Sequence, residues 1–490
     1  MAAIHMLAVI IKNPQTDELL LLKQTPPPKS GHEEEDACVD SDLYDLPSAT
    51  LDLLGSERQC QMVIHGAEAL VEKIDLRKFD IHRGILEVWE QLGRLTYSDR
   101  PWAFCNYVEE PEFGPGPPFK TVFLMGNSFP EDDHLEGQCK WMSVQSCLNW
   151  LLDVKPGSDR IGLLAVTSGL LNDSALSMEL KVPCSLPFQE YPPGIVLVPM
   201  GSRTAKPFHS TNLVIIAPAQ VIDCGVNSCI ANGVALIVDP GCKSEFHTAL
   251  MEIVAALPRK LVVFLTHHHR DHVDGLSIIE KCNPDATLVA HENSMRRLGK
   301  GDWSLGHTSV SGGEDIYVGN QHLRIIYAPG HTDGHLALLH VSTHSLIVGD
   351  HCVGHGSAFS DITSGGNMTE YFQTTYNFLG LSPHDIIPMH GRLNLWPQHM
   401  LCSYLRNRRN RESSILKVIA NGAASLFDIV SAVYSDVDAS VWIHAASNVR
   451  LHVDHLATQH KLPPEFSLEK FKDSCCMAFA NNDASTGLAT

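Results

Sequence analysis

The stretch Thr266-His267-His268-His269-Arg270-Asp271-His272 decides how the rest of the chain is interpreted. It follows Leu261 to Leu265, an apolar run that predicts a buried strand. The histidines therefore stand in a loop at the carboxyl end of that strand, where α/β proteins place their chemistry. His267 and His269 can reach one cation together, while Asp271 and His272 turn toward a second position beside it. A surface histidine tract is the alternative, but four potential ligands within six residues favour a metal site.

Further candidate ligands follow later strand-like runs: His331 after Leu323 to Tyr327, Asp350 after Ser345 to Val348, and His390 after Asp385 to Pro388. An aspartate can bind two cations with its two oxygens, which an imidazole cannot do. Upstream, Leu236 to Val238 is another strand-like run, and Asp239-Pro240-Gly241 forms the turn after it. The chain thus carries several potential ligands at the ends of separate strands.

Together these motifs resemble the metallo-β-lactamase superfamily. The resemblance implies an α/β fold, an αββα sandwich of two mixed sheets with helices outside, and a metal cleft along one edge between the sheets. It implies two Zn²⁺ ions, although mixed His/Asp sites also accept Fe or Mn. The implied ligand set has three groups: His267, His269 and His331 for the first ion, Asp271, His272 and His390 for the second, and Asp350 as the bridge.

The same resemblance implies hydrolysis by a hydroxide that bridges the two metals. Asp271 is then the expected catalytic residue, because it can orient the attacking water or accept its proton. Other histidines near the motifs are expected to lie around the site or in solvent: His268, His335, His351 and His355.

The composition restricts the function classes. A chain of 490 residues predicts two to four domains, and its net charge of −20 predicts no general attraction to nucleic acid or to an anionic membrane. Any polyanion must therefore be met by a local patch. The 14 cysteines include no CxxC pair and are expected to be reduced thiols. The sequence has neither a signal-type start nor an apolar run long enough to span a membrane, so a soluble cytoplasmic protein is expected. It shows no DNA-specific signal. The oligomeric state stays open.

Residues 1–153 have their own organisation. Met6 to Ile11 and Leu19 to Leu22 predict a hairpin, and the acidic loop Pro26 to Asp42, which includes Glu33 to Asp36, is expected to be solvated. Phe119 to Met125 is a further strand-like run. A helical stretch that ends in Ile85 to Gly93 resembles the tail of a Nudix box.

We lined up that box with the Nudix pattern on Glu87, Glu90 and Gly93, and it departs from the pattern at several positions. The family's opening glycine falls on Glu72 and its first glutamate on Lys78. The family's arginine falls on Leu86, and one of its paired glutamates on Gln91. Replacing a carboxylate by an amide removes charge that would hold Mg²⁺. We therefore expect a Nudix-like domain without Nudix hydrolysis, with an unrelated α+β domain as the alternative. By analogy, it would recognise a nucleotide or a CoA-like ligand. Residues 154–193 are expected to be a connector.

Residues 194–403 are expected to form the hydrolase domain. Residues 404–472 are expected to form a winged-helix-like domain with three short helices, Ile415 to Ile419, Leu426 to Val433 and Val441 to His455. Residues 473–490 are expected to be a mobile tail. The run Tyr404 to Arg411 contains four arginines, Arg406, Arg408, Arg409 and Arg411, which predict a local positive surface. The alternative is that they pair with acids such as Glu412. The winged-helix-like part would contact nucleic acid, or else serve packing or dimerisation.

Gly349 to Gly354 and Arg408 to Glu412, together with the winged-helix-like end, resemble the β-lactamase-like protein 2 group. That resemblance implies a zinc-dependent endoribonuclease with single-stranded RNA as the substrate. A glyoxalase II-like thioester hydrolase shares the histidine motifs and is the alternative.

Overall fold

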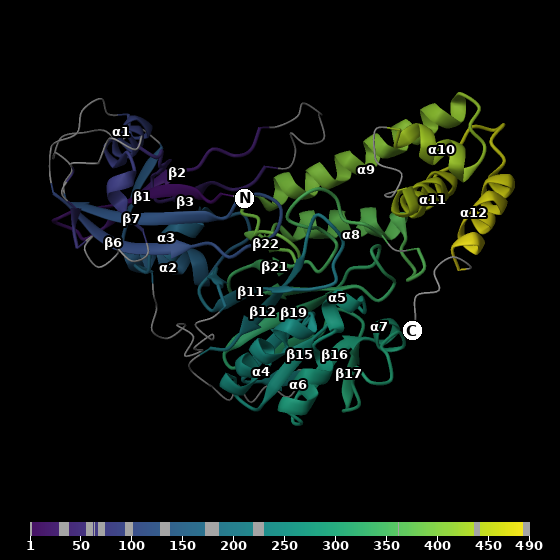
Figure 1. Ribbon diagram of the computed structural model, residues 1–490, viewed down its shortest axis with the longest axis horizontal. Coiled ribbons are helices and arrows are strands. Elements are labelled where there is room, and N and C mark those ends of the chain that lie inside the picture. The colour runs from purple at the N-terminus through teal and green to yellow at the C-terminus, as the bar shows by residue number, and fades with distance from the viewer. Residues whose placement is uncertain are drawn as a thin grey trace.

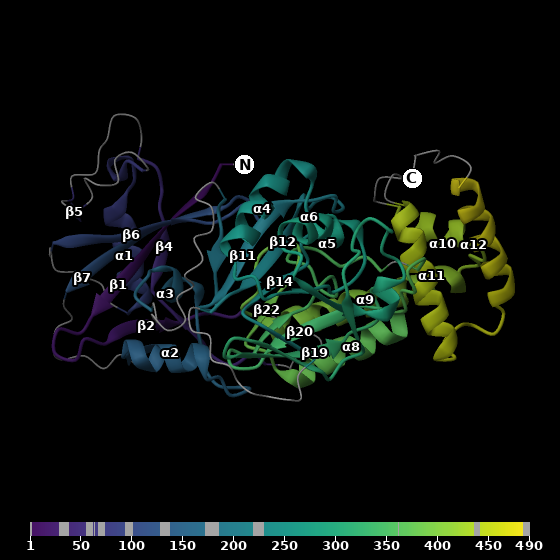
Figure 2. The same ribbon diagram turned by 90° about the horizontal axis from the view of Figure 1, so that it is seen from below.

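The computed structural model describes residues 2–28, 39–54, 62, 64–66, 74–93, 101–127, 138–171, 186–218, 230–360, 362–435 and 442–483. Figures 1 and 2 show an N-terminal sheet, a central pair of sheets and a group of C-terminal helices arranged in a row. Within these ranges, no helix combines the length and the apolar character needed to cross a membrane. The acidic residues 33–36 and Glu72 of the expected box lie outside the described residues.

The N-terminal sheet has nine strands, ordered β5-β6-β7-β1-β2-β3-β9, with β4 on β1 and β8 on β2. The strands are β1 (Ile4–Lys12), β2 (Leu19–Lys23), β3 (Leu43–Asp45), β4 (Ser48–Thr50), β5 (Ile64–His65), β6 (Trp102–Glu109), β7 (Phe119–Asn127), β8 (Cys139–Met142) and β9 (Arg160–Ile161). The helical segments are η2 (Leu76–Lys78), α1 (Ile81–Gln91), α2 (Val144–Leu152) and α3 (Leu163–Thr167). Strands β1 and β2 pair antiparallel, as the predicted hairpin requires.

Strand β1 contributes to cores on both faces of this sheet because its side chains alternate. Leu7, Val9 and Ile11 belong to the core that α1 covers, whereas Ala8 and Ile10 belong to the core that α2 and α3 cover. The expected helix is therefore present as α1, while the Nudix-like nature of the region stays a prediction.

The segment expected to be a connector contributes a strand to each of two sheets. Its β9 pairs with β3 of the N-terminal sheet, and its β10 (Gln189–Glu190) pairs with β11 (Ile195–Gly201) of the central part. This segment is thus anchored by backbone hydrogen bonds to the N-terminal sheet through β9 and to the first central sheet through β10.

The central part has two sheets. The first is ordered β10-β11-β12-β14-β15-β16-β17 and the second β13-β18-β19-β20-β21-β22. Their remaining strands are β12 (Ser210–Ile216), β13 (Ala231–Gly233), β14 (Ala235–Val238), β15 (Leu261–Phe264), β16 (Thr287–His291), β17 (His307–Val310), β18 (Asp315–Val318), β19 (Gln321–Tyr327), β20 (Leu336–His340), β21 (Ser345–Ile347) and β22 (Asp385–Ile387). The runs that predicted strands before the candidate ligands form β15, β19, β21 and β22.

Three hydrophobic cores make this part a four-layer sandwich. The core between the sheets includes Leu236 and Phe264 of the first sheet and Leu323 and Ile387 of the second. Outside them, one core packs helices α4 and α6 on the first sheet and another packs α8 and α9 on the second. The helical segments are η3 (Ser244–Phe246), α4 (His247–Ala256), α5 (Arg270–Val273), α6 (Leu276–Cys282), α7 (Glu292–Met295) and α8 (Met368–Leu381). The expected αββα architecture is confirmed.

The C-terminal helices are α9 (Pro397–Ala420), α10 (Leu426–Val433), α11 (Trp442–Thr458) and α12 (Leu468–Asp483). Helix α9 runs without a break across the boundary expected between residues 403 and 404, so a single helix joins the two parts. The tail that was expected to be mobile from Asp473 is helical as far as Asp483, because α12 continues to that residue, and Cys475 is buried beside Phe471. Residues 484–490 lie outside the described ranges.

Candidate metal centre

The two central sheets deliver the ends of their strands to one edge of the sandwich. In the first sheet, β14 and β15 are parallel neighbours, so Asp239 follows one strand beside the loop that starts at Leu265. In the second, β21 and β22 are also parallel and lead toward Asp350 and His390. Gly241 lets the turn after β14 lie directly against the histidine loop, because a Cβ at this position would lie 1.6 Å from the carbonyl oxygen of Asp271.

Three imidazoles form the first group of candidate ligands. His267 Nε2 lies 2.9 Å from His269 Nδ1, and His331 Nε2 lies 3.2 and 3.1 Å from these two nitrogens. Nitrogens that bind one ion at about 2.1 Å in a tetrahedral arrangement lie roughly 3.4 Å apart, and these three nitrogens lie only slightly closer together. The spacing therefore fits three ligands of a single cation.

The second group contains Asp271, His272 and His390. His390 Nε2 lies 3.3 Å from an Asp271 oxygen, and His272 Nε2 lies 3.9 Å from the other. These atoms lie close enough together to surround one ion. The structure thus brings all six candidate terminal ligands into two adjacent groups of three.

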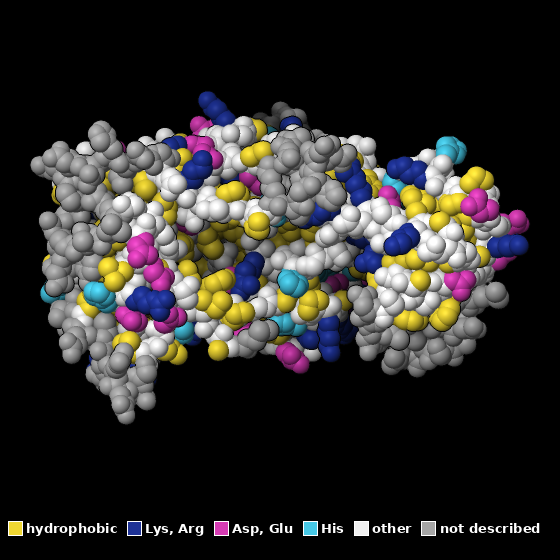
Figure 3. Space-filling view, turned by 90° about the horizontal axis from the view of Figure 1, so that it is seen from above, with side chains coloured by type: hydrophobic (Ala, Val, Ile, Leu, Met, Phe, Trp, Pro, Cys, Tyr) yellow, Lys and Arg dark blue, Asp and Glu magenta, His cyan; other side chains and the backbone are white. Residues whose placement is uncertain are grey.

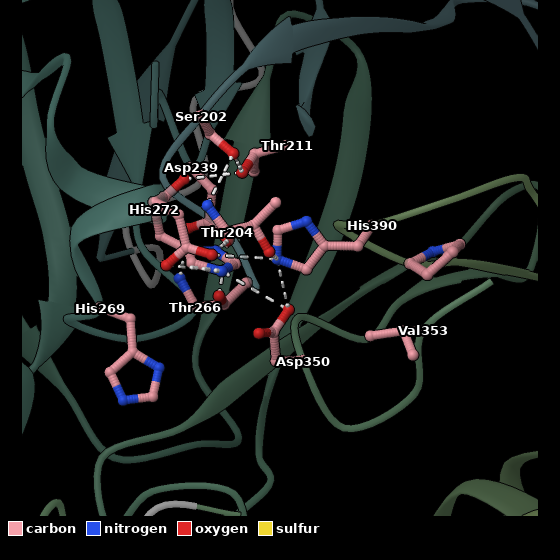
Figure 4. A network of polar contacts seen from close by, with 12 residues as sticks. Ser202, Thr204, Thr211, Asp239, Thr266, His269, His272, Asp350, Val353 and His390 are labelled. Atoms are coloured by element: carbon pink, nitrogen blue, oxygen red, sulfur yellow. Dashed lines mark hydrogen bonds and ion pairs between the residues drawn. The ribbon is translucent and has the colours of Figure 1, made fainter. Parts of the chain in front are cut away.

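Asp350 stands between the two groups and turns one oxygen to each. Its Oδ2 lies 4.0 Å from His267 Nε2 and 3.8 Å from His331 Nε2. Its Oδ1 lies 3.5 Å from His272 Nε2 and 3.3 Å from His390 Nε2, and Figure 4 shows these last two contacts converging on the carboxylate. This is the arrangement expected of a bridging carboxylate.

The outer nitrogen of most of these imidazoles is fixed by a neighbour. The contacts are His267 Nδ1 with Thr266 Oγ1 at 3.0 Å, His272 Nδ1 with Asp239 Oδ2 at 2.8 Å, His331 Nδ1 with the Phe359 carbonyl at 2.5 Å, and His390 Nδ1 with the Ser210 carbonyl at 2.9 Å. Such contacts orient the inner nitrogen toward a metal. His272 Nε2 and Asp350 Oδ1 are buried, and among the described residues neither has a partner with hydrogen-bond geometry. Buried lone pairs on imidazole nitrogen and carboxylate oxygen can bind a cation, so the residues fit a metal centre.

The pKa values separate the two groups. Burial, reinforced by the neighbouring imidazoles, holds the pKa of His267 well below its ordinary value and lowers that of His331 to about 3. Burial also disfavours charge on His390, but Asp350 and Asp271 outweigh it and raise its pKa to about 9. Burial likewise disfavours charge on Asp350, but His390 and His272 outweigh it and hold the pKa of that carboxyl well below its ordinary value. His267 and His331 are therefore neutral imidazoles, whereas the second group is a dense cluster of charge.

Asp239 and His335 have roles that the sequence motifs did not reveal. The fully buried Asp239 accepts hydrogen bonds from the Thr266 backbone N–H at 2.8 Å, the Thr266 hydroxyl at 2.6 Å and His272 Nδ1–H. His335 Nε2 accepts the Asp350 N–H at 3.1 Å. A carboxylate at the end of a buried strand next to the histidine loop was the available signal for Asp239.

The other histidines near the motifs lie outside the two groups. His268 Nε2 is 3.1 Å from Ser364 Oγ, His351 is buried against Thr375, and His355 is exposed.

Comparison with known protein families agrees with this arrangement. Residues 222–390 match the model of the metallo-beta-lactamase superfamily, and residues 425–462 match that of the beta-lactamase associated winged helix domain. The second match confirms the expected winged-helix part. Neither match reaches the N-terminal sheet.

Similar proteins include two that are named beta-lactamase-like protein 2 homolog. The one from Drosophila melanogaster is 26% identical over 212 residues, which is 41% of this chain and 69% of the relative. The one from Caenorhabditis elegans is 26% identical over 220 residues, 44% of this chain and 72% of the relative. A beta-lactamase domain protein from Burkholderia ambifaria, known as a crystal structure, aligns with 59% of this chain and 94% of its own at 18% identity and a TM-score of 0.49.

Proposed function

We propose that this chain, which carries a metallo-β-lactamase superfamily domain with an associated winged helix domain, is a binuclear zinc hydrolase that cleaves single-stranded RNA. The observation that carries the hydrolase assignment is Asp350, whose two oxygens face two separate ligand groups. Members of this superfamily are generally metal-dependent hydrolases, so the two groups have an evident use. Zinc suits a set of five imidazoles and two carboxylates, although iron and manganese suit it too.

Two divalent ions bound there would lower the pKa of a water between them toward neutrality. The chain's own residues then orient that water and handle its proton. Asp271 is the candidate for this role, because its two oxygens lie 3.9 Å from His272 Nε2 and 3.3 Å from His390 Nε2, next to the place where such a water would be bound. Although burial opposes charge on it, His272 and His390 hold its pKa below the ordinary value, so it stays ionised and can accept a hydrogen bond from the attacking water.

A pocket beside the metal centre supports RNA as the substrate. It has a volume of about 630 Å³ and lies between the loop at Ala205 and Lys206, the loop at 356–359, and helices α9 and α11. Phe359 links it to the centre, since its carbonyl contacts His331. Among its described lining residues there is no Asp or Glu, while Lys206, Arg408 and Arg411 are basic. In a chain of net charge −20, a pocket without acids suits a phosphodiester backbone.

The pocket also revises the expected arginine surface. Arg408 is buried, donates to the Ala358 carbonyl at 2.5 Å and lies over the Tyr371 ring. Arg409 donates to the Tyr376 hydroxyl, and Arg411 lies over the Tyr434 ring. The expected pairing with Glu412 is wrong for Arg408, since that carboxylate faces His452 and His455. Figure 3 shows Lys and Arg side chains singly or in small groups on one face, so RNA contact would be local.

Thioester hydrolysis is the second candidate. The hydroxyacylglutathione hydrolase of Aeromonas salmonicida is 34% identical over 103 residues, 21% of this chain and 37% of that enzyme. The shared segment covers the smaller part of both chains, so thioester hydrolysis ranks second.

The experiment compares single-stranded RNA, double-stranded RNA and S-lactoylglutathione as substrates of the zinc-loaded chain. We expect cleavage of single-stranded RNA, lost in Asp271→Ala. The double variant Lys206→Gln with Arg411→Gln should weaken RNA binding and flatten its salt dependence by about 0.7 per contact. Turnover of the thioester alone, unchanged by that double variant, would replace the RNA assignment by the second candidate.

A further inference from the structure

A second pocket lies where the N-terminal part meets β10 of the central part, and none of the candidate metal ligands lines it. It has a volume of about 440 Å³, within the usual range for small-molecule sites, and β1, β6, β7, α3 and β10 all contribute to it. Nothing in the proposed hydrolysis uses it. We call it the β6–β7 pocket.

The walls of the β6–β7 pocket are mainly apolar. Met6, Val108, Phe119, Leu163, Leu164 and Val166 supply most of this surface. Phe188 also lines it and leaves 44% of its surface exposed, which is unusual for a large aromatic side chain. An apolar ligand body would cover surface that now faces water.

Three carboxylates line the pocket, and two of them have cationic partners. Glu110 binds Arg392 with both oxygens, at 2.6 and 2.9 Å. Glu109 lies 3.1 Å from Lys120 Nζ and accepts the Tyr107 hydroxyl at 2.9 Å. The charges of these two carboxylates are therefore compensated within the protein.

Glu190 differs from these two carboxylates. Its Oε1 accepts the backbone N–H of Gly194 at 2.7 Å, but none of the described residues places a cation at its second oxygen. Burial raises the pKa of this carboxyl, as expected where a charge lacks a partner. An uncompensated carboxylate beside apolar walls is a recognition feature for a cation with an apolar body.

We propose that the β6–β7 pocket binds a small molecule that joins an apolar body to a protonated amine, with Glu190 as the partner of the amine. The described lining contains no Lys or Arg, so a phosphate group would meet only carboxylates and neutral groups. This argues against the nucleotide or CoA-like ligand expected for this domain. The inference does not depend on the proposed hydrolysis, because its test needs neither metal nor RNA.

Glu190 has a structural role that the test must separate from ligand binding. Its hydrogen bond from Gly194 holds the turn between β10 and β11. Glu190→Gln is the matched variant, because the amide oxygen keeps that acceptor while the charge disappears. Glu109→Gln is the control, because it removes a lining carboxylate that already has a partner.

The test measures binding of 2-phenylethylammonium, 2-phenylethanol and phenyl phosphate to the full chain at pH 8 by calorimetry. We expect the ammonium to bind about ten-fold more tightly than the alcohol of the same shape, because it gains a charge-assisted hydrogen bond. Phenyl phosphate should bind most weakly. Glu190→Gln should bring the ammonium and the alcohol to similar affinities, while Glu109→Gln should keep their difference.

Equal affinities for the ammonium and the alcohol in the unchanged chain would overturn the proposal. The proposal would also be overturned if neither of these two compounds bound. A preference for the ammonium that persists in Glu190→Gln would also overturn it. Because the first comparison needs no substitution, the proposal stays testable even if a variant fails to fold.

Discussion

Arg392 and Glu110 form a two-pronged ion pair, with Nε to Oε1 at 2.6 Å and Nη2 to Oε2 at 2.9 Å. Arg392 stands two residues after the candidate ligand His390, whereas Glu110 belongs to the loop between β6 and β7 of the N-terminal sheet. Arg392 also donates to the Pro117 carbonyl of that loop at 2.7 Å. Phe113 of the same loop is buried in the core between the central sheets. The N-terminal part therefore helps to hold the loop that carries His390.

The first prediction is that Glu110→Gln weakens metal retention. The variant loses the charge that fixes Arg392, so His390 is held less firmly, and loss of outer support of this kind costs about 10- to 100-fold in metal affinity. Competition with a chelator measures the affinity of each ion, and one ion should be released before the other. Glu109→Gln is the control, because Glu109 pairs with Lys120 instead. Equal retention in both variants would show that the pair serves only the contact between the two parts.

The second prediction concerns Asp239. In Asp239→Asn, an amide must replace a carboxylate that accepts three hydrogen bonds, so at least one donor loses its partner and His272 is less well oriented. We expect metal affinity to fall about 10- to 100-fold. The control is Asp274→Asn, because Asp274 pairs with Arg270 and Arg203 and contacts none of the candidate ligands. If the two variants retain metal equally well, Asp239 has no special role.

The grouping of the candidate ligands could be expected from the sequence, because they lie in the loops, or in the short helix α5, that come after strands β15, β19, β21 and β22. Long-range contacts were not predictable in this way, since Glu110 and Arg392 are 282 residues apart and neither lies in a motif. The helix that enters the expected tail was not predicted, because small and polar residues suggest mobility, whereas Phe471 and Cys475 of α12 are buried. Arg408 was misjudged as a surface residue because charge alone does not reveal burial, and this residue is 5% exposed.

The third prediction tests the structural role of Arg408 by comparing its contribution to the free energy of unfolding with that of an exposed arginine. Arg408→Gln should lower the free energy of unfolding by about 1–3 kcal/mol, because the buried Ala358 carbonyl loses its donor. Arg259→Gln should change it by less than about 0.5 kcal/mol, because the Arg259 side chain is exposed and its ion pair with Asp285 is long, at 3.8 Å. Urea unfolding of both variants checks this. Equal losses would contradict the structural role of Arg408.

The fourth prediction concerns pH. Burial raises the pKa of Asp385 to about 7, against the hydrogen bond from Ser345 and the nearby Arg160. The folded state therefore binds a proton more tightly than the unfolded state. The stability from this group is complete below about pH 4 and is lost as the pH rises to about 7.

Asp385→Asn removes this dependence. At pH 8 the variant should be more stable than the parent, by on the order of 2–4 kcal/mol, because no buried carboxylate has to ionise. Near pH 4 the difference should be small. Urea midpoints measured from pH 4 to pH 8 test it, and parallel curves for the two proteins would contradict the prediction.

The central claim is that seven residues form one centre for two ions: His267, His269, Asp271, His272, His331, Asp350 and His390. Elemental analysis of the full chain, purified without exposure to chelators, tests it most directly. We predict about two ions per chain, and a clear loss in Asp350→Ala, whose carboxylate faces both groups. A content below about half an ion per chain, in folded protein supplied with zinc, would contradict the assignment of these residues to a binuclear metal centre.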